Sequence, residues 1–118
     1  MSGTLSHLVG LSAESAVARH YAARGLVLIE TRWRCAAGEI DLVLREGETV
    51  VMVEVKKSRS HDRAALRITP RQRARLLAAA AIYLDGLPSG ALTEMRFDVA
   101  LVDGQGRVDI LADAFAGG

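Results

Sequence analysis

The stretch "GEIDLVLREGETVVMVEVKK", residues 38–57, decides the fold, and charged residues interrupt both of its apolar runs. The two runs alternate apolar residues over strand-like lengths and are separated by "EGE", which predicts an antiparallel β-hairpin. Side chains alternate across a strand, so we predict one apolar face, made of Ile40, Leu42, Leu44, Val51, Val53 and Val55. The opposite face then gathers, at the end away from the turn, the charged residues Glu39, Asp41, Glu54 and Lys56.

The turn leaves two registers open for these acids. A two-residue loop at positions 46 and 47 would set Asp41 opposite Met52, so that Glu54 lies on the diagonal. A four-residue loop would set Asp41 directly opposite Glu54. Either register brings the two carboxylates within reach of one shared ion.

Acids gathered on a partly buried face cost free energy, because like charges repel and burial disfavours the ionised form. Hard oxygen ligands close together suit Mg²⁺, which usually takes one or two carboxylates and completes its shell with water and substrate phosphate. Lys56 would then orient an attacking water or stabilise negative charge at phosphorus. The alternative is a surface salt-bridge cluster in which Lys56 only neutralises Glu54.

The flanking segments predict further strands and two helices. We expect a helix over residues 12–24 that Ser12 caps and Gly25 ends, then a strand over 26–33. Later strands over 95–102 and 107–111 are joined by the turn "DGQG". A right-handed crossover through the intervening helix would place the strand over 95–102 on the sheet.

The clearest helix is "TPRQRARLLAAAAIYLDG", residues 69–86. Thr69 is positioned to cap it, Gln72 completes a capping box, and Gly86 ends it. The helical period predicts a core stripe of Leu76, Leu77, Ala80, Ala81 and Leu84.

A basic block surrounds the start of this helix. Its polar segment 58–68 has no clear period and predicts a mobile loop. Phosphate contacts are one role for the block, and an ordinary solvated surface is the other. Its cations, against the single acid Asp62, are Lys56, Lys57, Arg59, Arg63, Arg67, Arg71, Arg73 and Arg75.

Length and composition predict one globular domain over residues 1–118, with residues 1–10 and 116–118 loose. The net charge of +1 does not by itself indicate a polyanion-binding protein. The single cysteine, Cys35, favours a reducing compartment, so we expect a cytoplasmic protein. The longest apolar stretch is too short to span a bilayer, and no membrane association is expected.

The motifs "GEIDLV" and "VMVEVK" resemble the acid, acid and lysine core of the restriction-endonuclease-like, or PD-(D/E)xK, nuclease superfamily. With "RWRCAAGEIDLV", "TPRQRARL" and "RFDVALV" in this order, the chain resembles the YraN family, uncharacterised protein family 0102, from about Glu14 to Phe115. The resemblance implies an α/β fold with a mixed β-sheet flanked by helices, similar to archaeal Holliday-junction resolvases. The chain departs from the family pattern at Ser58, where an arginine is usual, and at Gln72, where a lysine is usual.

Carried onto this chain, the resemblance implies that Asp41, Glu54 and Glu14 bind Mg²⁺ or Mn²⁺ and that Lys56 assists the water. An acid at Glu14 is also what the dipole of a helix's first turn favours. Glu39 and Asp98 are candidate supporting residues, and Asp98 could equally be an ordinary structural acid. The predicted nucleic-acid contacts are Lys57, Arg59, Arg63, Arg67, Arg71 and Arg75.

We therefore expect a metal-dependent endonuclease acting on DNA, with branched or structured DNA favoured and RNA kept as an alternative. A second hypothesis is a nucleic-acid-binding module that keeps the nuclease fold and cuts little or nothing alone. Small nuclease-fold proteins often act as dimers, so a homodimer is a further expectation. Dependence on divalent ions separates the two hypotheses, because only the nuclease needs metal for turnover.

Overall fold

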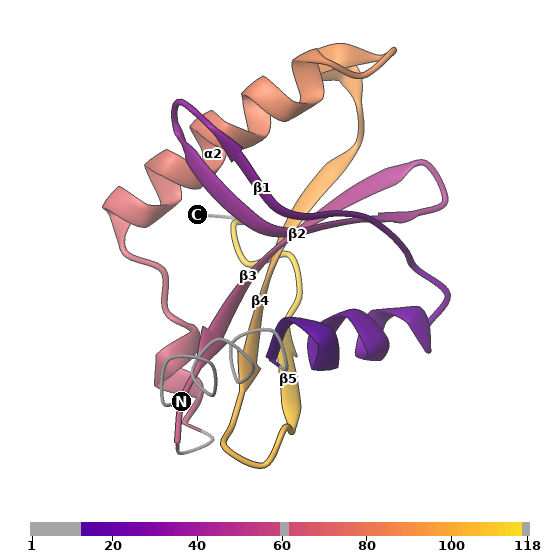
Figure 1. Ribbon diagram of the computed structural model, residues 1–118. Coiled ribbons are helices and arrows are strands. Elements are labelled where there is room, and N and C mark those ends of the chain that lie inside the picture. The colour runs from indigo at the N-terminus through magenta and orange to yellow at the C-terminus, as the bar shows by residue number, and fades with distance from the viewer. Residues whose placement is uncertain (1–12, 60–61, 117–118) are drawn as a thin grey trace, which may run out of the picture.

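The computed structural model describes residues 13–59 and 62–116, which form a five-stranded mixed sheet with helices on both faces (Figure 1). The strands lie in chain order and are β1 Val27–Cys35, β2 Gly38–Glu46, β3 Thr49–Lys57, β4 Met95–Val102 and β5 Val108–Leu111. Neighbouring strands are antiparallel except β3 and β4, which are parallel. The helix α2, Pro70–Asp85, connects that parallel pair, so the predicted α/β class and crossover connection are confirmed.

Each helix covers its own apolar cluster on one face of the sheet. The first helix, described over residues 13–22, packs Val17 and Tyr21 against Leu42, Leu44 and neighbouring residues of β3 and β4. On the other face, α2 packs against a cluster that includes Val43, Met52 and Phe97. Because side chains alternate along β2 and β3, these two strands contribute residues to both clusters. The first helix is followed by a turn that ends at Gly25, where φ is +90°. Ser12, the expected N-cap of this helix, lies outside the described residues.

The hairpin between β2 and β3 has the second of the two predicted registers, but the predicted four-residue loop was wrong. Leu42 pairs with Val53 and Glu46 pairs with Thr49, so the turn is only Gly47 and Glu48. One further step of this register would set Asp41 opposite Glu54, but the regular pairing ends before it. The predicted apolar face was wrong at Ile40, which packs in the cluster under α2, because the regular β2–β3 pairing ends at Leu42.

The helix α2 begins as predicted, with a capping box in which Thr69 and Gln72 each bond the other's backbone. Its core stripe was wrong at two positions, since Leu77 and Ala81 are exposed and Ala79 is buried instead. The buried residues are Leu76, Ala79, Ala80 and Leu84. In a run of consecutive alanines, several stripes have almost the same hydrophobicity, so the helical period alone could not choose the buried one.

The expectation of a loop without regular structure over 58–68 was wrong for part of that segment. A 3-10 helix, η1, runs over Arg63–Leu66, and the carboxylate of Asp62 caps it by accepting a hydrogen bond from the Ala64 N–H. Leu66 is buried against Val99 and Leu101 and so fixes η1 to the sheet. No helix in the described part of the chain is long and apolar enough to cross a membrane.

Candidate functional site: an acidic pocket at the end of the hairpin

The predicted acids line a pocket of about 200 Å³ between the open end of the hairpin and α2. Asp41 and Glu54 come from β2 and β3, whereas Gln72 and Arg75 come from the first half of α2. Both Asp41 and Glu54 are half-buried. The fold thus brings the two carboxylates together and places an exposed guanidinium across from them. The complete lining is Gly38, Glu39, Asp41, Glu54, Gln72, Arg75 and Leu76.

A backbone group holds Asp41 in place. Regular pairing of β2 with β3 stops at Leu42 and Val53, and beyond it the Asp41 Oδ2 accepts a hydrogen bond of 2.8 Å from the Val55 N–H. The carboxylate therefore replaces a missing strand partner. Because one oxygen is engaged in this way, the side chain has a fixed orientation in the pocket.

The two carboxylates affect each other's ionisation. Burial, the charge of Asp41 and a hydrogen bond with Asp41 raise the pKa of Glu54 to about 7, although the charges of Lys56 and Arg75 oppose the shift. Burial also raises the pKa of Asp41; the Val55 N–H works against this shift, while the charges of Glu39 and Glu14 add to it. Ionising both groups therefore costs free energy that a bound cation could offset.

This pair should make the protein less stable as pH rises from 5 to 8. The folded-state pKa of Glu54, about 7, exceeds its ordinary value of 4.5, so its contribution is complete below 4.5 and is lost as pH passes 7. After screening we expect the free energy of unfolding to fall by roughly 1–2 kcal/mol from this pair. Urea unfolding of wild type and Glu54→Gln at both pH values measures the effect. Identical pH profiles for the two proteins would contradict it.

Lys56 does not make the predicted salt bridge with Glu54. Its Nζ donates a 2.9 Å hydrogen bond to the carbonyl of Arg67, immediately after η1, and no ion pair between Lys56 and Glu54 is found in the described structure. The positive charge still lowers the pKa of Glu54, so the ammonium lies near the pocket. The alternative interpretation, in which Lys56 neutralises Glu54 through a direct salt bridge, is therefore not supported.

Glu14 is held by an arginine that the sequence analysis did not single out. The Arg32 Nε lies 3.0 Å and 3.1 Å from the two carboxylate oxygens of Glu14. Glu14 is close enough for its charge to raise the pKa of Asp41, but it lines a separate pocket with Arg32 and Leu42. A positive φ of 48° at Arg32, in the middle of β1, is the structural feature that marks this residue.

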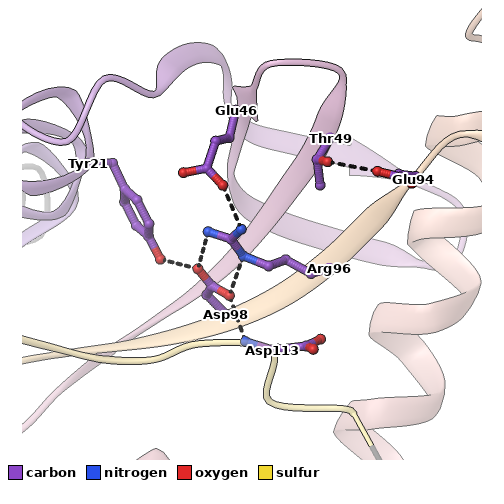
Figure 2. Close-up of polar contacts among 7 residues, drawn as sticks. All are labelled: Tyr21, Glu46, Thr49, Glu94, Arg96, Asp98 and Asp113. Atoms are coloured by element: carbon purple, nitrogen blue, oxygen red, sulfur yellow. Dashed lines mark hydrogen bonds and ion pairs between the residues drawn. The ribbon is translucent and has the colours of Figure 1, made fainter.

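The two supporting candidates have different surroundings. Glu39 lines the acidic pocket and lies 3.6 Å from the Arg34 guanidinium. Asp98 is 1% exposed and belongs to a buried network on the side of the first helix (Figure 2). It accepts hydrogen bonds from the Tyr21 hydroxyl, the Arg96 guanidinium and the Asp113 N–H. Asp98 is therefore a structural acid outside the pocket.

The predicted nucleic-acid contacts do not form one continuous group. Arg75 lines the acidic pocket, whereas Lys57 and Arg59 line a different pocket of about 360 Å³ beside Asp103. Arg67 and Arg71 are exposed. Arg63 lies in η1, with its side chain outside the described part.

No group of three or more histidine, cysteine or acidic side chains in the described part of the chain is arranged to hold a metal ion. Two carboxylates nevertheless match the usual protein share of an Mg²⁺ site. Asp41 and Glu54 are hard oxygen donors, both disfavoured as neighbouring anions, so the donor chemistry fits a hard divalent cation.

Fold and site together define a small α/β domain with an acidic pocket, lined by Glu39, Asp41 and Glu54, at one end of a mixed sheet. The model of uncharacterised protein family UPF0102 matches residues 13–102, and the chain belongs to this family.

Full-length relatives share the same family name. A UPF0102 protein of Cereibacter sphaeroides is 53% identical over 116 residues, which cover 98% of this chain and 99% of the relative. A second, of Ruegeria pomeroyi, is 54% identical over 116 residues, or 98% and 94% of the two chains. A third, of Dinoroseobacter shibae, is 44% identical over 111 residues, or 94% and 83%.

Proposed function

We propose that this protein is a metal-dependent endonuclease with a restriction-endonuclease-like core that hydrolyses phosphodiester bonds in DNA. The observation that carries the proposal is the half-buried pair of Asp41 and Glu54, which line one pocket with Arg75 and raise the cost of ionising each other. Neither Asp41 nor Glu54 forms an ion pair in the described structure, and the Lys56 ammonium bonds a backbone carbonyl instead.

Asp41 and Glu54 would hold Mg²⁺ or Mn²⁺, with Glu14 as a candidate third carboxylate. A bound divalent ion lowers the pKa of water and stabilises charge that develops at phosphorus. Asp41 enters this role already oriented by the Val55 N–H. Glu54 would have to be ionised to bind the metal, so occupation of the site should depend on pH.

The neighbouring cations would bind the DNA backbone and stabilise the reaction. Lys56 would orient the nucleophile or stabilise negative charge after exchanging the Arg67 carbonyl for substrate. Arg75 lines the same pocket, where a guanidinium can pair with two phosphate oxygens. The Gln72 side chain uses its carbonyl oxygen in the capping box, which leaves its amide NH₂ as a donor at the pocket.

Incubation with labelled duplex, single-stranded and four-way-junction DNA tests the proposal. We expect cleavage of at least one DNA with Mn²⁺ and none after chelation of the metal, with Glu48→Gln, at the far end of the same hairpin, as active as wild type. Binding to DNA that is indifferent to metal, without cleavage, would instead support the binding-module hypothesis. Such binding should still weaken steeply with salt.

A further inference from the structure

The helix α2 packs along one side of the sheet (Figure 1), and its residues on the side away from the buried stripe include several apolar ones. Ala74, Ala78, Ala81 and Ile82 follow this face at helical spacing and are exposed, Ile82 by 46%. Leu77, which is 41% exposed, lies at the edge of the face. The core-facing stripe is fully used against β2 and its neighbours, so this outer apolar face has no partner in the described chain.

Charges stand at the two ends of the same face. Arg71 precedes Ala78 by seven positions, and Asp85 follows it by seven. Both side chains are exposed, and neither belongs to an ion pair in the described part of the chain. Each charge also stands at the end of α2 that has its own sign. Arg71 lies in the first turn, at the positive end of the helix dipole, and Asp85 lies in the last turn, at the negative end.

We propose that this outer face is a self-association surface at which a second copy of the chain packs antiparallel to the first. A two-fold axis at Ala78 sets Arg71 of each copy opposite Asp85 of the other. The same axis sets each Ile82 against the small Ala74 of the other copy.

Helix packing physics favours this arrangement. Alanine at the axis lets two helices approach to about 8 Å. Each N-terminus then lies beside the C-terminus of the second copy, so the dipoles attract and Arg71 gains the anionic environment that its own helix end lacks. The contact would remove apolar surface of Ile82, and part of that of Leu77, from water on both sides of the axis.

The contact reaches the acidic pocket only at Arg75. Gln72 and Leu76, which line that pocket, lie on the opposite side of α2 from Ala78, whereas Arg75 lies between the pocket and the outer face. The arrangement also gives Arg71 a role other than the DNA contact predicted from the sequence. The β1 edge also exposes Val27 to Ile29, but a register shift between Leu28 and Glu30 interrupts that strand, which makes it a poorer surface for pairing.

The contact is small, because 16 residues give a helix of about 24 Å. Interfaces of this size are usually weak, so we expect a reversible monomer–dimer equilibrium at roughly 10 µM to 1 mM. Sedimentation velocity of the full chain over this range measures it. We expect wild type to shift toward dimer with concentration and Ala78→Glu to stay monomeric, with circular dichroism showing that the variant is folded.

A charge exchange identifies the partner as a second copy in this orientation. Arg71→Glu and Asp85→Arg alone should each weaken the dimer roughly tenfold, because both symmetry-related pairs become repulsive. The double variant should recover most of that loss. A monomeric wild type at every concentration, a dimer that survives Ala78→Glu, or a double variant no better than the singles would each overturn the proposal.

Discussion

Asp41→Asn should lose metal-dependent DNA cleavage by on the order of a thousandfold while the protein remains folded. The substitution removes the negative charge but keeps an oxygen that can accept the hydrogen bond from the Val55 N–H. Loss of a charged metal ligand removes several kcal/mol of transition-state stabilisation, since each 1.4 kcal/mol is about tenfold in rate.

The matched control is Glu48→Gln, which removes a carboxylate of the same hairpin at its turn. Rates with saturating Mn²⁺, together with thermal unfolding, separate catalysis from stability. A folded Asp41→Asn variant that still cleaves DNA at the wild-type rate would contradict a catalytic role for Asp41. Equal loss in Glu48→Gln would indicate a general effect of charge.

Asp98→Ala should destabilise the protein by about 3–5 kcal/mol, the largest effect expected on stability. Asp98 is 1% exposed, and its carboxylate accepts 2.7 Å and 3.1 Å bonds from the Tyr21 hydroxyl and the Arg96 Nε (Figure 2). Removing it leaves the buried Tyr21 hydroxyl and the Asp113 N–H without their acceptor, and leaves the Arg96 guanidinium with Glu46 alone. Burial and the hydrogen bond to Asp98 also raise the pKa of Tyr21, so the hydroxyl stays a donor.

The exposed pair of Thr49 and Glu94 is a suitable control, because it is a single hydrogen bond of 3.2 Å in the same region (Figure 2). Glu94→Ala should cost less than about 0.5 kcal/mol. Chemical unfolding of both variants checks the contrast. A cost for Asp98→Ala no larger than for Glu94→Ala would show that the network does not hold the first helix to the sheet.

The sequence predicted those features that depend on local chemistry. The capping box of Thr69 and Gln72 and the strand alternation of β2 and β3 follow from residues close together in the chain; the box is present, and the alternation holds except at Ile40. The closeness of Asp41 and Glu54 was also predicted, because either of the two registers brings the two carboxylates together. Local patterns were therefore sufficient to place the two principal acids.

Contacts between distant segments could not be predicted in the same way. The bond from Tyr21 to Asp98 joins residues 77 positions apart, and Arg32 holds Glu14 across 18 positions. The Lys56 bond to the Arg67 carbonyl depends on η1, which Leu66 fixes by packing on β4. Each of these contacts requires the folded sheet before its partners meet.

Calorimetric titration of Mn²⁺ into the wild-type protein and Asp41→Asn tests the proposed metal site most directly. We expect wild type to bind one ion per chain at about pH 8. Binding should be weaker at about pH 6, because a proton on Glu54 competes with the metal. Asp41→Asn should not bind Mn²⁺. Absence of Mn²⁺ binding by wild type at either pH, or equal binding by Asp41→Asn, would contradict a metal site at Asp41 and Glu54.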